Sequence, residues 1–173
     1  LGSIGWRVLR PMQRLGSRLL GSERFDLVYF STTQFPLFLL GRGWQRDHGT
    51  AYVLDFHDPC YREDDAPPVW AKRSLKHETS RRLAGMIESR SVLGASGLVA
   101  VSSNYIETLQ RRYSARRPAW MPPGKNEAIP FGVLPRDLEE AQRSIPRMSE
   151  ASRERVRLVY VGAGGPIMER SFS

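Results

Sequence analysis

The sequence has little of three things that define whole classes of protein: cysteine, lysine and long apolar runs. Cys60 is the only cysteine, which excludes an intrachain disulfide framework and a cysteine-based zinc site. The longest uninterrupted apolar run, residues 35–40, is far shorter than the roughly 20 residues of a membrane-spanning helix. The first twenty residues also lack the continuous apolar stretch of a signal peptide. We therefore expect a cytoplasmic protein.

Arginine carries almost all of the positive charge. The chain has 26 Lys and Arg against 18 Asp and Glu, a formal net charge of +8, and its only lysines are Lys72, Lys76 and Lys125. Such an excess favours an anionic partner, although a solvated arginine-rich surface explains it as well. Because no basic–aromatic interleaving or reader motif is present, we expect no nucleic-acid partner.

A basic amphipathic helix is predicted over residues 4–20. Arginines recur on one face at spacings of three and four: Arg7, Arg10, Arg14 and Arg18. The other face is apolar: Ile4, Val8, Met12, Leu15 and Leu19. Pro11 is expected to kink or break this helix unless the helix starts there. We interpret it either as a surface helix packed on its own sheet or as a peripheral contact with an anionic membrane, on the inner face.

Short apolar segments alternate with helical ones along the rest of the chain. Strands are predicted at residues 25–30, 51–56, 97–101, 128–133 and 157–161. Helices are predicted at residues 35–47, 70–93, 105–113 and 137–145. The strands are apolar on both faces, which favours a parallel sheet with helices on each side. The predicted class is therefore α/β, a Rossmann-like doubly wound parallel sheet.

Ligands of such sheets bind beyond the carboxyl ends of the strands. This rule selects Ser31 and Thr32, then His57 and Asp58, and finally a polar run, Ser102, Ser103 and Asn104. A histidine beside a carboxylate can orient or deprotonate a hydroxyl, although Asp58 in a plain turn explains the pair too. The polar run stands at the start of a predicted helix, where it can bind an anion or a sugar hydroxyl. The alternative is that it only caps the helix, since Asn104 and Glu107 have capping-box spacing.

A glycine-rich turn follows the last predicted strand. It consists of Gly162, Ala163, Gly164 and Gly165. The backbone of such a turn can bind a phosphate. Because no Gly-Lys-Ser/Thr sequence follows, it is not a Walker motif, and an ordinary tight turn is an equal alternative.

The order of these segments resembles the amino-terminal half of a family 4 (group 1) glycosyltransferase. The resemblance is carried by residues 25–31, 52–59, 97–102, 129–133 and 158–162. It implies a GT-B architecture, two Rossmann-like domains that face a cleft. Residues 1–150 would then be an acceptor-binding domain that is incomplete at its start. Residues 151–173 would be a linker and the first strand and loop of a truncated donor-binding domain.

The resemblance also implies a reaction, the transfer of a sugar from a nucleotide-sugar donor to a glycan or lipid-linked acceptor. His57 and Asp58 would lie near the reacting hydroxyl, and Ser31, Thr32 and residues 102–104 would line the cleft. Residues 162–165 would approach the donor diphosphate, whose departure needs no obligatory metal or other cofactor. This chain alone is expected to be inactive. The alternative is a non-catalytic α/β binding module that associates with a membrane surface or a partner.

Overall fold

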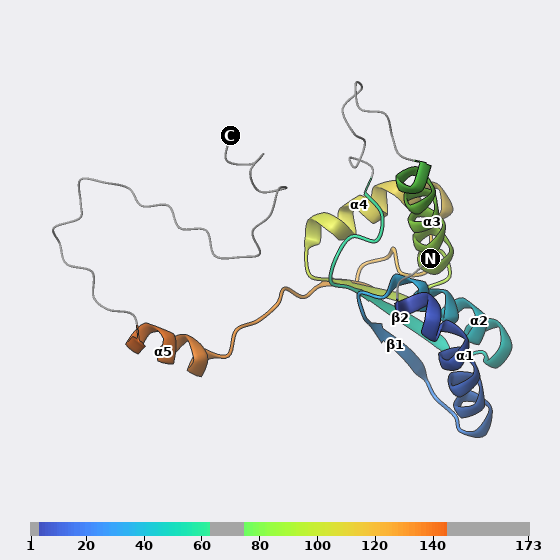
Figure 1. Ribbon diagram of the computed structural model, residues 1–173, viewed down its shortest axis with the longest axis horizontal. Coiled ribbons are helices and arrows are strands. Elements are labelled where there is room, and N and C mark those ends of the chain that lie inside the picture. The colour runs from blue at the N-terminus through green and yellow to red at the C-terminus, as the bar shows by residue number, and fades with distance from the viewer. Residues whose placement is uncertain (1–3, 63–74, 145–173) are drawn as a thin grey trace. The chain divides into compact units, whose positions relative to one another are not determined.

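A computed structural model describes residues 4–62 and 75–144, in two units that divide after Phe131. The first unit contains, in chain order, α1 (Ile4–Ser22), β1 (Leu27–Ser31), the 3₁₀ helix η1 (Phe35–Phe38), α2 (Leu39–His48), β2 (Ala51–Phe56), α3 (Leu75–Val92), β3 (Gly97–Ala100), α4 (Ser103–Tyr113), the 3₁₀ helix η2 (Ser114–Arg116) and β4 (Asn126–Ala128) (Figure 1). The second unit contains α5 (Pro135–Ser144), whose side chains are exposed.

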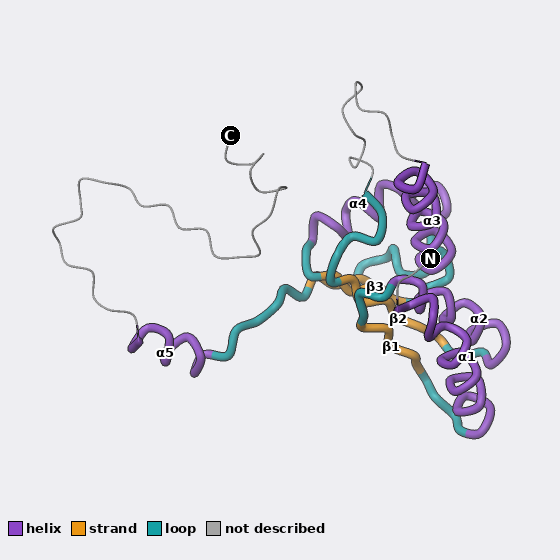
Figure 2. The backbone as a smooth tube through the Cα atoms, viewed as in Figure 1, coloured by secondary structure: helices purple, strands orange, loops and turns teal. Residues whose placement is uncertain are grey.

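The four strands of the first unit form one parallel sheet in the order β1-β2-β3-β4 (Figure 2). In its register Phe30 lies beside Leu54, and Leu54 lies beside Leu98. Helices flank this sheet, which confirms the predicted α/β class and is consistent with a Rossmann-like doubly wound fold.

Helices α1 to α4 lie on one face of the sheet. Alternate residues of β2 show this: Tyr52, Leu54 and Phe56 are fully buried, whereas Ala51, Val53 and Asp55 are partly exposed. Tyr52 Oη donates to the Ser91 carbonyl of α3 at 2.6 Å, and the Phe56 ring packs edge-on against Tyr105 of α4. Because the strand order runs in one direction, right-handed crossovers place the connecting helices on the same side. Residues 4–62 and 75–131 thus supply one helical layer of the expected doubly wound sheet.

The contact of α1 with α2 depends on a glycine. A Cβ at Gly16 would lie 2.1 Å from the Trp44 indole, so only a bare backbone lets the two helices approach this closely. The same indole stacks on Phe30 of β1 and donates to Ser17 Oγ at 3.1 Å. The expectation that Pro11 breaks the helix is wrong, because α1 runs through it. The packing of α1 outweighs the one hydrogen bond that Pro11 removes.

Several predicted boundaries also need correction. The helix expected at residues 35–47 begins as η1, and the strand expected at 128–133 is β4, which ends at Ala128. Pro130 lacks the amide hydrogen that a longer ladder requires. The capping box at Asn104 does not form, because α4 already begins at Ser103 with Ser102 at its N-cap. The strand predicted at 157–161 lies outside the described residues.

We predict that Gly16→Ala destabilises the protein by about 1–3 kcal/mol, because the added methyl group overpacks against Trp44. Gly43→Ala is the matched control: it makes the same change within a helix, but nothing lies within 4 Å of the new Cβ. The control should gain about 0.5–1 kcal/mol from helix propensity. Urea denaturation of both variants measures the difference. Equal effects of the two substitutions would contradict the close approach of α1 to Trp44.

Candidate functional site

Three polar side chains meet at the carboxyl ends of β1 and β2. Ser31 Oγ donates to Asp55 Oδ2 at 2.9 Å, and His57 Nε2 lies 3.0 Å from Ser31 Oγ and 3.1 Å from Asp55 Oδ2. Strand alternation places Ser31 and Asp55 as register partners on the face of the sheet opposite the helices. His57 follows β2 at the next position of the same alternation. We call Ser31, Asp55 and His57 the sheet-edge cluster.

The geometry of the cluster fixes the hydrogen on the histidine. A carboxylate has no hydrogen to give, so His57 Nε2 must carry the hydrogen that bonds Asp55. In the neutral ring Nδ1 is then the acceptor, and it makes no hydrogen bond in the described part of the chain. The His57 side chain keeps 28% of its surface exposed, so a ligand hydroxyl can approach the ring.

The cluster is not a serine-protease type of relay. In such a relay the two ring nitrogens bond different partners, the serine on one side and the carboxylate on the other. Here a single nitrogen, Nε2, contacts both Ser31 and Asp55. The Ser31 hydroxyl also donates to Asp55, so no base withdraws its proton. The arrangement can bind and orient a hydroxyl, but it does not activate Ser31 as a nucleophile.

Two aromatic residues border the cluster. Partial burial, and next a hydrogen bond to Asp55, raises the pKa of the Tyr29 phenol, which therefore stays protonated at neutral pH. The Phe131 ring meets His57 edge-on, with the ring centroids 5.4 Å apart. Phe131 is 72% exposed, so it offers an apolar surface directly beside the polar groups. Polar groups next to an exposed ring suit a ligand with both hydroxyl and apolar faces.

The structure treats the predicted site residues differently. It brings Ser31 and His57 into contact, whereas Thr32 Oγ1 accepts a hydrogen bond from the Gln34 amide instead. The Asp58 side chain is exposed and has no hydrogen bond or ion pair to any described residue.

The polar run after β3 opens α4. Ser102 is the N-cap of this helix and makes no side-chain capping bond, and Ser102, Ser103 and Asn104 are all exposed. The glycine-rich turn at residues 162–165 lies outside the described residues.

Sequence reasoning missed Asp55, because this residue is surrounded by apolar strand residues. A signal was present: Asp55 stands two residues before His57, so a strand places both side chains on one face.

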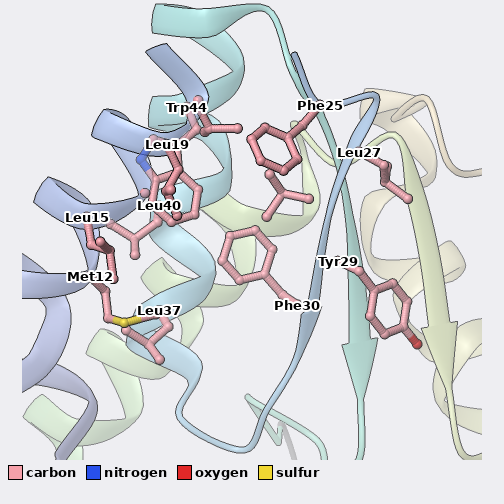
Figure 3. A pocket seen from close by; sticks show the side chains of 13 residues that line it. Met12, Leu15, Leu19, Phe25, Leu27, Tyr29, Phe30, Leu37, Leu40 and Trp44 are labelled. Carbon is pink, nitrogen blue, oxygen red and sulfur yellow. The ribbon is translucent and has the colours of Figure 1, made fainter. Parts of the chain in front are cut away.

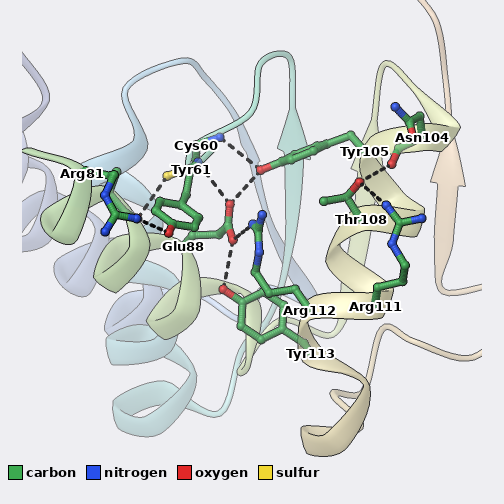
Figure 4. Close-up of polar contacts among 11 residues, drawn as sticks. Cys60, Tyr61, Arg81, Glu88, Asn104, Tyr105, Thr108, Arg111, Arg112 and Tyr113 are labelled. Carbon is green, nitrogen blue, oxygen red and sulfur yellow. Dashed lines mark hydrogen bonds and ion pairs between the residues drawn. The ribbon is translucent and has the colours of Figure 1, made fainter. Parts of the chain in front are cut away.

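A second polar centre lies between α3 and α4 (Figure 4). Glu88 of α3 is fully buried and is surrounded by donors: the Arg112 guanidinium, the hydroxyls of Tyr105 and Tyr113, and the backbone amide of Tyr61. Tyr105 Oη also accepts from the Cys60 amide at 3.1 Å. The centre therefore joins two helices to the segment that follows β2. We call it the Glu88 network, and it was not predicted from the sequence.

Cys60 lies beside the Glu88 network. Burial, and next the negative charge of Glu88, raises the pKa of the Cys60 thiol to about 12. At neutral pH the thiol is therefore protonated, and a protonated thiol is a poor nucleophile. Cys60 is therefore a buried thiol of low reactivity.

Comparison with known proteins adds nothing to this geometry. Neither a scan against protein-family models nor a search of curated proteins found a match to the chain. In residues 4–62 and 75–144 no group of three or more His, Cys, Asp or Glu side chains is arranged to hold a metal ion. No helix in that part of the chain is long and apolar enough to cross a bilayer. The sheet-edge cluster is the candidate site, because its polar groups meet at strand ends beside an exposed aromatic ring.

We predict that Cys60 of the native protein reacts with iodoacetamide at pH 8 at least a hundredfold more slowly than Cys60 of the urea-unfolded chain. The reason is that burial and the raised pKa leave almost no thiolate in the folded state. A Cys60→Ser, Ser103→Cys variant is the control, because position 103 is exposed and should react quickly in the folded protein. Mass spectrometry follows both reactions. A native Cys60 that reacts as fast as the unfolded one would contradict its placement.

Proposed function

We propose that this protein is the acceptor-binding part of a glycosyltransferase that resembles family 4. The first unit binds the acceptor, and the complete enzyme transfers a sugar to it from a nucleotide-sugar donor. The observation that carries this proposal is the sheet-edge cluster. In this cluster His57 Nδ1 is a hydrogen-bond acceptor, the Asp55 carboxylate contacts the other ring nitrogen, and the exposed Phe131 ring lies beside them. All of them lie at the strand ends where α/β sheets bind ligands.

The cluster supplies the acceptor side of such a reaction. His57 Nδ1 accepts a hydrogen bond from a sugar hydroxyl and takes its proton as the oxygen attacks the donor sugar. Asp55 stabilises the imidazolium that forms, and Ser31 holds the ring in place. The bond between the donor sugar and the nucleoside diphosphate breaks, and the diphosphate leaves with the electron pair.

The donor side of the reaction is assigned outside the described residues. Backbone amides of residues 162–165 would contact the diphosphate, and neighbouring basic groups would stabilise its charge without an obligatory metal. The acceptor would be a glycan or a lipid-linked glycan. Asp58 and residues 102–104 are exposed and follow the carboxyl ends of β2 and β3, where they would contact the more distant parts of such an acceptor.

A non-catalytic binding module is the second candidate. It is favoured by α1, on which arginines and large apolar side chains are both exposed. In this case the sheet-edge cluster would only connect the ends of β1 and β2 and would bind no sugar.

We predict that oligosaccharides at millimolar concentration shift the backbone NMR signals of Ser31, Asp55 and His57 in the full chain. His57→Ala should weaken this binding by about tenfold or more, because it removes both the acceptor nitrogen and the partner of Asp55. Chemical-shift titration with a panel of glycans gives both affinities.

Asp26→Asn is the matched control, since this exposed carboxylate directly precedes β1 and so lies at the opposite end of the sheet from the cluster. It should bind as the unchanged chain does, whereas Asp55→Asn should bind more weakly. If no glycan shifts these signals, or if His57→Ala binds as well as the unchanged chain, the binding-module alternative replaces the proposal.

A further inference from the structure

Helix α1 presents a face of unpaired positive charge. Its four arginines, Arg7, Arg10, Arg14 and Arg18, are exposed, and none forms an ion pair with another described residue. The helix contains no Asp or Glu. At 100° and 1.5 Å per residue, the four side chains fall within about 80° of the helix circumference and span about 16 Å of its length. They form a single basic stripe, which we call the arginine stripe.

An exposed apolar surface lies beside the arginine stripe. Met12, Leu15 and Leu19 are 42%, 52% and 43% exposed, on the part of α1 between the stripe and its buried face. They lead into an apolar pocket of about 390 Å³ between α1 and β1 (Figure 3). The pocket continues to Phe25, itself 40% exposed. A contiguous apolar surface of this kind marks an interaction site.

The charge decides between possible occupants. A second copy of the chain on a two-fold axis would set one arginine stripe against another, so like charges would oppose the contact. An uncharged apolar ligand would fill the pocket and leave the arginines without partners. An anionic bilayer matches both features, because its phosphates pair with guanidinium groups and its acyl region accepts the apolar side chains. The open, elongated stripe suits an array of headgroups better than one acidic side chain.

We propose that α1 docks this protein on the surface of a membrane that contains anionic lipids. The arginine stripe contacts the headgroup phosphates, and Met12, Leu15 and Leu19 enter the interface beside them. The helix lies on the membrane and does not cross it. This inference does not rest on the proposed sugar transfer, because α1 carries no residue of the sheet-edge cluster.

Vesicle sedimentation tests the proposal. The full chain should pellet with phosphatidylcholine vesicles that contain phosphatidylglycerol, but not with pure phosphatidylcholine vesicles. Raising the salt concentration should release it, because salt screens the phosphate contacts. Replacing all four arginines of the stripe by Gln should lower the partition coefficient by about fivefold for each arginine removed.

The control removes the same charge elsewhere: Arg42, Arg111, Arg116 and Arg136, all exposed, are replaced by Gln. It should bind nearly as well as the unchanged chain, and Leu15→Gln should bind more weakly while keeping the salt dependence. Circular dichroism checks that each variant is folded.

Three results would overturn the proposal. The first is no binding to anionic vesicles. The second is equal binding by the stripe variant and the control, which would place the contact on another surface. The third is a dimer, or a complex with an acidic protein, that requires α1 while vesicles are ignored.

Discussion

A carboxylate buried between two helices constrains the part of the molecule that carries the candidate site. Glu88 has no exposed surface, so its charge must be met by donors within the protein. Removing one partner of such a buried pair typically costs about 3–5 kcal/mol, because the other charge is left unpaired. Arg112 supplies the opposite charge from α4, and it also lies over the Tyr61 ring, 4.9 Å from its centroid. Through these contacts α3, α4 and the segment after β2 hold one another in place.

The Glu88 network and the sheet-edge cluster lie at the two ends of one short segment. His57 stands at its start and Tyr61 at its end, where the amide of Tyr61 donates to Glu88. The helices on one face of the sheet thus anchor a segment whose first side chain, His57, lies on the other face. The proposed sugar site at the sheet edge and the proposed membrane contact along α1 are therefore compatible on this unit.

The sequence predicted what depends on local pattern and on the rule that ligands bind at strand ends. A short apolar run located β2, the alternation of such runs with helical segments indicated the α/β class, and the end of β2 selected His57. Asp55 was not predicted as a site residue, because its contact with Ser31 depends on which strand lies beside β2. The sequence of one segment does not show that register. The Glu88 network was not predicted for the same reason. Within α3 alone Glu88 is one polar helix residue among several, and it is buried only by the packing of α4. Pro11 shows the reverse case, in which tertiary packing overrides a strong local signal.

Amide hydrogen exchange of Glu88→Gln tests most directly whether the Glu88 network positions the segment from His57 to Tyr61. The substitution keeps the shape of the side chain but removes the charge that Arg112 and the tyrosine hydroxyls contact. We expect faster exchange at the amides of Cys60 and Tyr61, with β2 protected as before. Glu107→Gln, which changes an exposed glutamate of α4, should leave exchange at these amides unchanged. Unchanged protection at Cys60 and Tyr61, or equal loss of protection throughout β2, would contradict it.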